Sequence, residues 1–398
     1  MLHNTSKDLL SLESGQCNFL TNAIAIKDIQ GKIKPCCGFG TTDLSFKIPT
    51  VFDVDSLDEI FVSEVWQNIR KNLKTTNKSY HACSKCWNKE SMNIDSLRMY
   101  AFEHSAQLKT IKKNKLQYLE IALDNTCNMM CRMCRPACSS KWLSAKDVTN
   151  KLQNLEHDHF LNNNLQAKRY SDKLNLVLDN TNFSDIETIH IVGGEPFYSK
   201  NFYKLLDKIG SQANLEKVKL SISTNGSILP KEYFSLFKKL RQLEIFFSID
   251  AVGDLANCIR WGVDFSLIDK NINDWLTLKD NTKFISYTTL NIQNCNKVND
   301  IINWNVNKNL SYTFNPLNRP KYLKLNQLPL HERKKFKIDK KILQKNTTLK
   351  NILYDNNLDT NNLKKFLESC EILDKHQGIQ FEKVNPEIYN LAKKYAVY

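Results

Sequence analysis

The chain has 398 residues, of which 41% are hydrophobic, 25% charged and 10% aromatic. This composition is typical of globular proteins and excludes a long disordered or collagen-like chain. The N-terminal residues lack a basic stretch followed by an apolar one, and no apolar run approaches the length of a membrane span. We therefore expect a soluble, cytoplasmic protein with no membrane partner, built from a central domain with one or two smaller attachments.

Most of the positive charge lies in one segment of the chain. Residues 319–350 hold eleven Lys and Arg against Glu332 and Asp339, and so carry +9 of the formal net charge of +14. A basic arm of this kind could meet an acidic partner or nucleic acid, although such runs are more often the solvated face of a helix. We interpret residues 319–398 as a basic, helical C-terminal appendage.

The twelve cysteines occur mainly in groups, which favours metal or cluster ligands over disulfides in a chain without a secretory signal. Four of them, Cys17, Cys36, Cys83 and Cys86, fall in the first hundred residues. A strand over Ala23–Gln30 that returns through Lys32–Pro35 would bring the first two together. Four thiolates fit either a fully ligated iron-sulfur cluster or a structural zinc ion.

Further along, short apolar runs alternate with amphipathic stretches, a pattern typical of a parallel sheet with crossover helices. The predicted strands are Tyr118–Leu123, Thr188–Val192, Val218–Ser223, Leu243–Ile249, Phe284–Leu290 and Leu310–Phe314. The predicted helices are Asn201–Ile209, Lys231–Arg241 and Phe265–Leu278, together with one that starts at the capping box of Ser56 and one over Ser139–Lys146. The polar segment Lys151–Asp185 is predicted to be an insertion at the first crossover.

Directly after the first of these strands, Cys127, Cys131 and Cys134 are spaced C-x3-C-x2-C. Soft sulfur ligands suit an iron-sulfur cluster or zinc, and three thiolates on a four-iron cluster would leave one iron open to another ligand. Cys138 could close the cluster as a fourth ligand, and the chain would then be an electron-transfer protein. A zinc-stabilised protein that binds nucleic acid through the basic arm is a further alternative.

Other polar and glycine-rich motifs follow the next strands. Gly193-Gly194-Glu195-Pro196 comes after the second strand and Thr224-Asn225-Gly226 after the third, while Ser248 stands at the end of the fourth. The carboxyl ends of parallel strands meet at one edge, so these loops should form one pocket with the three cysteines. Glu195 offers an acceptor for an ammonium group, and Ser223 and Asn225 could bind a ribose.

The three motifs, in this order and spacing, resemble the radical S-adenosylmethionine (SAM) superfamily. The resemblance implies an α/β fold with a partial (β/α)6 TIM-like barrel over residues 111–318. It also implies a [4Fe-4S] cluster on Cys127, Cys131 and Cys134, whose open iron binds the amino and carboxylate groups of SAM. The residues that it assigns to cofactor binding are Met133, Gly193, Gly194, Glu195, Pro196, Ser223, Asn225, Ser248 and Arg260.

The N-terminal cysteine layout resembles the SPASM and Twitch auxiliary-cluster modules of some superfamily members. This second resemblance implies that residues 1–110 hold a second iron-sulfur cluster on Cys17, Cys36, Cys83 and Cys86. The implied reaction is reductive cleavage of SAM to a 5′-deoxyadenosyl radical, which takes a hydrogen atom from a peptide or protein side chain, or from a small alcohol or sugar. A flavodoxin or ferredoxin would supply the electron.

Overall fold

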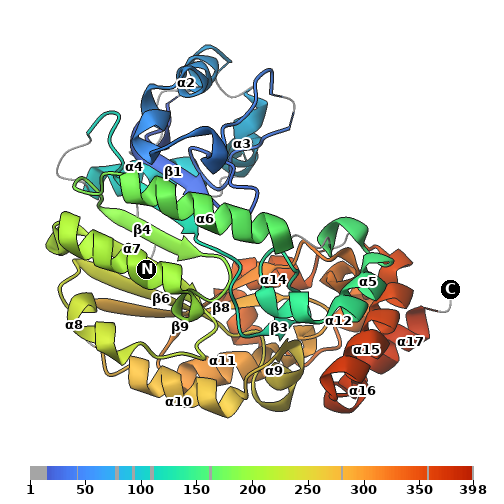
Figure 1. The fold of residues 1–398 in the computed structure, drawn as a ribbon. Coiled ribbons are helices and arrows are strands. Elements are labelled where there is room, and N and C mark those ends of the chain that lie inside the picture. Colours follow the sequence, from blue (N-terminus) through green and yellow to red (C-terminus); the bar gives the residue numbers. More distant parts are fainter. Residues whose placement is uncertain are drawn as a thin grey trace.

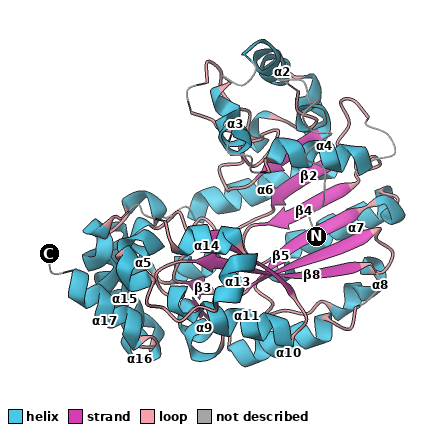
Figure 2. Ribbon diagram, turned by 180° about the vertical axis from the view of Figure 1, so that it is seen from behind, coloured by secondary structure: helices cyan, strands magenta, loops and turns pink. Residues whose placement is uncertain are grey.

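The computed structural model describes residues 16–42, 44–76, 80–91, 95–107, 112–160, 164–278, 281–355 and 358–396. Its centre is a seven-stranded parallel sheet with the strand order β1-β2-β4-β5-β6-β8-β9 (Figures 1 and 2). The strands are β1 Ala23–Ile26, β2 Tyr118–Ala122, β4 Thr188–Val192, β5 Lys219–Thr224, β6 Gln242–Ser248, β8 Thr282–Leu290 and β9 Ser311–Pro316. All six predicted barrel strands are confirmed, with small shifts at their ends.

The seventh strand, β1, was not expected in this sheet. Its register sets Ala23 opposite Tyr118 and Ile26 opposite Ile121, so it extends the sheet at the β2 edge. The predicted return strand is reduced to one bridge, in which the Ala25 and Lys34 backbones exchange hydrogen bonds of 2.7 and 3.0 Å. Four consecutive apolar residues that are all buried suit a parallel strand covered on both faces better than a half-exposed hairpin.

Helices cover the sheet and extend from both of its ends (Figure 1). The longer helices are α2 Glu64–Thr76, α3 Ser84–Ser91, α4 Leu97–Gln107, α5 Lys146–Gln153, α6 Asn164–Asn180, α7 Lys200–Gln212, α10 Phe265–Trp275, α11 Val298–Asn307, α15 Leu363–Gln377 and α17 Pro386–Tyr395. The shorter ones are α1 Phe19–Asn22, α8 Phe234–Phe237, α9 Gly253–Ile259, α12 Leu330–Arg333, α13 Lys340–Lys345, α14 Thr347–Leu353 and α16 Phe381–Val384. Within the residues that the structure describes, every helix is too short or too polar to cross a membrane.

Two helix predictions, at Asn201–Ile209 and Phe265–Leu278, are confirmed by α7 and α10. The predicted helix over Lys231–Arg241 is confirmed only for its first part, because a 3-10 turn over Lys231–Tyr233 leads into the four residues of α8 and the helix ends at Phe237. The backbone N–H groups of Lys239 and Leu240 bond three residues back, and that of Arg241 bonds to Leu215 O at 3.0 Å. The start of β6 at Gln242 thus forces the chain to tighten and turn into the sheet.

The helix predicted from Ser56 is interrupted. A 3-10 helix over Leu57–Val62 ends at Ser63, and α2 begins at Glu64. The Ser63 hydroxyl donates to Ile60 O at 2.7 Å and accepts from Trp66 N at 3.3 Å. A serine that bonds to the backbone on both sides competes with continuous helix at this position.

The segment 151–185 is not an insertion. It contains α6, the crossover helix that joins β2 to β4 and lies along the sheet (Figure 1). Tyr170 of α6 is fully buried, and its hydroxyl donates to Ala122 O at the end of β2. The many asparagines of the segment concealed the apolar stripe of a normal crossover helix.

The basic arm is partly a structural element. The side chain of Arg333 is buried, and its guanidinium donates to Leu328 O at 2.9 Å, Leu353 O at 2.5 Å and Asp355 O at 2.6 Å. It therefore holds the turns on both sides of α13 and α14 together. The neighbouring Glu332 binds Lys335 and Lys394, which neutralises part of the local positive charge.

We expect Arg333→Met to lower the free energy of unfolding by about 3 kcal/mol, because three buried carbonyl oxygens lose their donor. Arg319→Met is the matched control. The Arg319 side chain is 50% exposed and meets Glu156 at 3.6 Å, so its loss should change the free energy by less than about 1 kcal/mol. Urea unfolding followed by circular dichroism measures both values, and equal losses in the two variants would contradict the structural role of Arg333.

Candidate active site

The loop with the three central cysteines follows β2 and is held by a short antiparallel ladder. In this ladder β3, Met130–Cys131, pairs with β7, Arg260–Trp261, and Cys131 lies directly opposite Arg260. At the other end of the loop, Cys127 N donates to Ser140 Oγ at 3.0 Å. Instead of the helix predicted over Ser139–Lys146, a 3-10 helix over Ser140–Ser144 precedes α5, and the Ser139 hydroxyl donates to Met129 O at 2.6 Å.

The three thiols are close enough to affect one another's protonation. Burial raises the pKa of Cys127 to about 12, and Cys131 beside it acts in the same direction. Burial also raises the pKa of Cys134 well above the usual range, with further contributions from Cys138, Cys131 and Cys127. Buried thiols of this kind become thiolates readily only when a metal supplies compensating positive charge. Three thiols are the type of donor that an iron-sulfur cluster takes.

Glu195 joins two strand-end loops. Its side chain is 1% exposed, and its carboxylate accepts from Thr224 Oγ1 at 2.7 Å, Asn225 N at 2.6 Å and Phe197 N at 3.2 Å. Burial raises the pKa of Glu195 to about 7, whereas these hydrogen bonds act in the opposite direction. A carboxylate offers about four acceptor positions, so three partners leave about one for a ligand.

The two glycines before Glu195 let its loop approach the segment between β2 and the first cysteine. A Cβ on Gly194 would lie 2.2 Å from Thr126 O, and Gly193 has a φ of +108°. A side chain would clash at Gly194 and would be strained at Gly193, so neither position accepts another residue without a shift of the backbone. As a result, Glu195 N reaches Thr126 O at 2.7 Å, directly beside Cys127.

Asn225 extends the connection to the cysteine loop itself. Its Nδ2 donates to Asn128 Oδ1 at 2.9 Å, and Asn128 Nδ2 donates to Ser227 Oγ at 2.9 Å. The sequence analysis did not assign Asn128 a role, although its place inside the cysteine motif was a usable signal. It also missed Asp124, whose Oδ2 accepts from Ser199 Oγ and from Asn201 Nδ2 at 2.8 Å.

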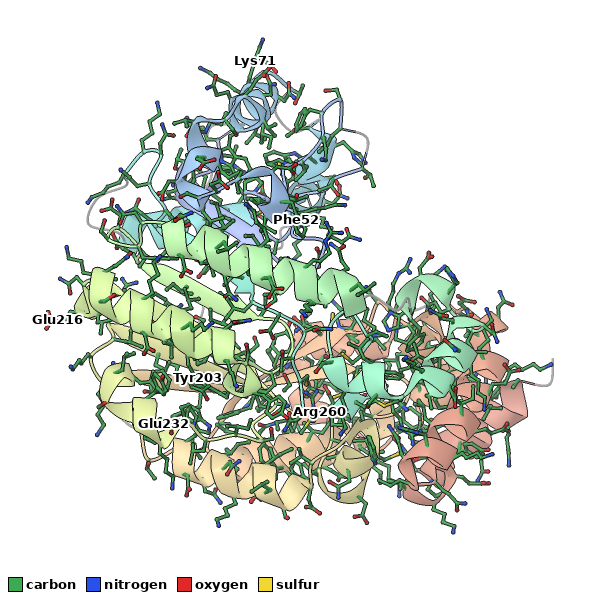
Figure 3. All side chains as sticks on the ribbon, in the orientation of Figure 1. Phe52, Lys71, Tyr203, Glu216, Glu232 and Arg260 are labelled. Carbon is green, nitrogen blue, oxygen red and sulfur yellow. The ribbon has the colours of Figure 1, made fainter. Side chains whose placement is uncertain are left out.

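Arg260, labelled in Figure 3, lies directly opposite Cys131 in the ladder of β3 and β7. Its Nη1 forms an ion pair with Asp250 Oδ2 at 2.5 Å, and Asp250 Oδ1 accepts from Thr289 N at 2.7 Å. The Nε atom of Arg260 is buried and has no hydrogen-bond partner among the described residues. An unpartnered buried donor beside Cys131 suits the carboxylate of a bound ligand. Asp250, which orients this arginine, was missed.

The remaining predicted cofactor residues lie at the same strand ends with less distinct roles. Ser223 Oγ is 3.5 Å from His190 Nε2 inside the barrel. Ser248 ends β6 opposite Tyr287. Met133 is half-buried between the second and third cysteines, and the buried Pro196 opens a 3-10 turn after Glu195.

The C-terminal helices reach the cysteine loop through Arg132, whose side chain is 0% exposed. Its Nη2 forms an ion pair with Asp374 of α15 at 2.5 Å, and its Nε contacts Gln377 Oε1 and Cys258 O, each at 3.0 Å. Gln377 in turn donates from Nε2 to Met130 O at 3.4 Å. The appendage therefore packs on the backbone that carries Cys131.

The four N-terminal cysteines also come together. Cys17, Cys36, Cys83 and Cys86 line one small cavity, together with Arg98 and apolar side chains. Burial raises the pKa of Cys17 to about 11 and of Cys83 to about 12, and Cys86 acts in the same direction on both. Across the described ranges, no three His, Cys, Asp or Glu side chains surround the position of a single metal ion.

A model of the Radical SAM superfamily matches residues 121–303. Two curated proteins named GTP 3',8-cyclase are similar. The one from Alkaliphilus oremlandii is 22% identical over 209 residues, 52% of this chain and 58% of that protein. The one from Desulforamulus reducens is 27% identical over 137 residues, 34% of this chain and 35% of that protein. The chain thus spans little more than half of the first relative and about a third of the second.

Among solved structures, Streptococcus suis SuiB bound to S-adenosylmethionine is 14% identical, with a TM-score of 0.33, over 78% of this chain and 53% of that chain. The structure of anSMEcpe with bound AdoMet and the Cp18Cys peptide is 16% identical, with a TM-score of 0.33, over 67% and 62%. The likeness to both is distant. The stretch that matches the model of the Radical SAM superfamily contains the central cysteines and the motifs after β4 and β5.

Proposed function

We propose that this chain is a radical SAM enzyme whose reaction starts at Cys127, Cys131 and Cys134. The observation that carries the proposal is the junction at Glu195. Its carboxylate binds the backbone of Asn225, and its own N–H binds Thr126 O next to the first cysteine. Three strand-end loops are thus fastened around one place, an arrangement that an isolated electron-transfer cluster does not require.

Membership of the superfamily implies a [4Fe-4S] cluster and SAM. When bound, this pair supplies one-electron cleavage of SAM and a 5′-deoxyadenosyl radical that takes a hydrogen atom from the substrate. The three cysteines would hold the cluster, Glu195 would accept a hydrogen bond from the SAM ammonium, and Arg260 Nε would bind its carboxylate. Burial of Glu195 and Asp250 would exclude water from these contacts.

The N-terminal cavity supports a second cluster within the same proposal. Four thiols around one cavity fit a closed iron-sulfur site, in the manner of a Twitch or SPASM module. Strand β1 pairs with β2, with Ala23 opposite Tyr118, and so joins this module to the barrel sheet. The second cluster would then conduct or accept an electron, with a flavodoxin or ferredoxin as the external reductant.

One observation favours a second candidate function. Cys138 lies near Cys134, and Arg135 Nε donates to the Cys138 sulfur at 3.4 Å. If Cys138 became a fourth ligand, the central cluster would be closed and would serve electron transfer alone. The two candidates differ in what they predict for variants of Cys138.

We expect the chain, reconstituted anaerobically with iron and sulfide, to bind about eight irons in two clusters. Cys134→Ala should bind about four and form no 5′-deoxyadenosine after reduction with SAM, because the central cluster loses a ligand. Cys295→Ala, a buried thiol outside both groups, is the control and should retain both properties. Iron analysis and chromatography of the products measure the outcome.

Cys138→Ala separates the two candidate functions. The enzyme should keep its full iron content and its SAM cleavage in this variant, whereas a closed electron-transfer cluster should lose iron. Cleavage of SAM by Cys134→Ala at the rate of the unmodified chain would refute the proposed function.

We expect Glu195→Gln to weaken SAM binding by roughly 10- to 100-fold, since a charged hydrogen bond contributes about 1.5–3 kcal/mol. The amide nitrogen also cannot accept from Asn225 N, so the junction between the loops loosens. Glu216→Gln, on the exposed turn before β5, is the control and should bind SAM normally. Isothermal titration of SAM into the reconstituted chain measures the affinity, and equal affinities in both variants would remove Glu195 from the cofactor site.

A further inference from the structure

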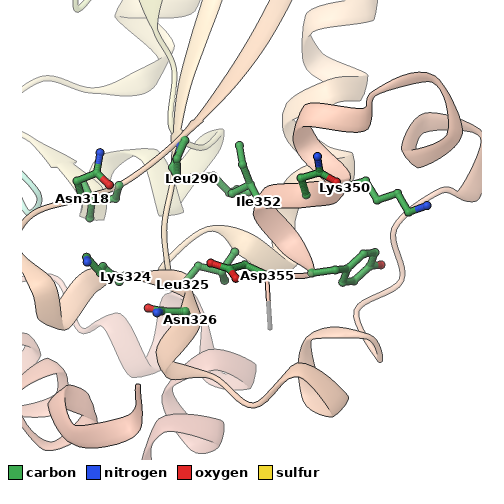
Figure 4. A pocket seen from close by; sticks show the side chains of 12 residues that line it. Leu290, Asn318, Lys324, Leu325, Asn326, Lys350, Ile352 and Asp355 are labelled. Carbon is green, nitrogen blue, oxygen red and sulfur yellow. The ribbon is translucent and has the colours of Figure 1, made fainter. Parts of the chain in front are cut away.

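A cavity of about 680 Å³ opens between the last two strands and the C-terminal appendage (Figure 4). Leu290 and Pro316, the final residues of β8 and β9, form one wall. The turn at Lys324–Asn326 and the end of α14 up to Asp355 form the others. Its volume lies within the range of roughly 300–1,000 Å³ that ligand sites occupy.

The cavity lies at the edge of the sheet where the candidate active site is built. Leu290 follows Thr289, whose N–H donates to Asp250 Oδ1. The other oxygen of Asp250 accepts from Arg260, which is paired with Cys131. One carboxylate therefore connects the wall of the cavity to the backbone of the cysteine loop. In parallel sheets this edge is where ligands bind.

The lining of the cavity carries two positive side chains and one negative side chain. Lys324 and Lys350 have no ion-pair partner among the described residues, and they lie on opposite sides of the close-up, with Asp355 between them in that view (Figure 4). Amide side chains of Asn318, Asn326 and Asn351 complete the polar part of the lining. The apolar part consists of side chains such as Leu325 and Ile352.

We propose that this cavity binds an extended peptide that carries acidic side chains, and that this peptide contains the substrate. Two separated lysines suit two carboxylates along an extended chain, and the amides suit peptide N–H and C=O groups. A nucleotide polyphosphate concentrates its charge in one place and would favour clustered cations, whereas Asp355 would repel it. The assignment as substrate rests on the proposed function, but the binding itself does not.

The test uses the full chain, reconstituted anaerobically, and the blocked peptide acetyl-Ala-Glu-Ala-Glu-Ala-amide. Its counterpart with Gln in place of both Glu is the reference probe. We expect the acidic peptide to bind roughly tenfold more tightly than the reference in isothermal titration, and Lys324→Gln/Lys350→Gln to abolish this difference. The control variant Lys340→Gln/Lys345→Gln removes the same charge from exposed positions of α13 outside the cavity. It should still bind the acidic peptide more tightly than the reference peptide.

Equal binding of the two peptides, or no binding of either, would overturn the proposal. The proposal would also be overturned if GTP bound more tightly than the acidic peptide and Lys324→Gln/Lys350→Gln abolished that binding. The cavity would then be a nucleotide site. Formation of 5′-deoxyadenosine is measured separately in all variants. If the acidic peptide binds as expected while the unmodified chain cleaves no SAM, the proposed function fails and the peptide site stands.

Discussion

The arrangement of the candidate active site depends on the buried carboxylate of Glu195. It lies where three loops meet and is bonded to the loop after β5, while its own backbone is bonded to the loop after β2. A buried carboxylate without partners would be costly, so its donors must stay in place in the folded chain. The positions of the loops thus depend on the hydrogen bonds that the Glu195 carboxylate needs. Gly193 and Gly194 let its loop approach the loop after β2 closely.

A second group of contacts comes from the other end of the chain. Arg132 carries a buried charge in the middle of the cysteine motif and meets Asp374 and Gln377 of α15. The appendage is therefore a part of the site's support, and other residues of it, between Lys324 and Asp355, line the cavity beside β8 and β9.

The residue patterns along the sequence predicted the strands of the sheet better than the side-chain contacts between distant segments. The continuous apolar runs gave the barrel strands, as at Thr188–Val192, because burial on both faces leaves a clear signal in the residues themselves. The helix expected after Pro230 ends four residues early, at Phe237, since the chain must turn there to enter β6. Asp250 and Asn128 were assigned no role, because Asp250 also binds Thr289, 39 residues away, and Asn128 binds Asn225, 97 residues away. In the same way, no residue near Arg132 indicates that its partner Asp374 follows 242 residues later.

The contact between Arg132 and α15 also has a consequence for the order of biosynthetic events. The cysteine motif leaves the ribosome long before the residues that complete its surroundings, since Phe381 N is still needed to bind the second oxygen of Asp374. A nascent chain therefore presents its three thiols on a loop that lacks its final support. The contacts that hold Arg132 in place can therefore be completed only after residue 381 has been translated, when all strands of the sheet have already been made.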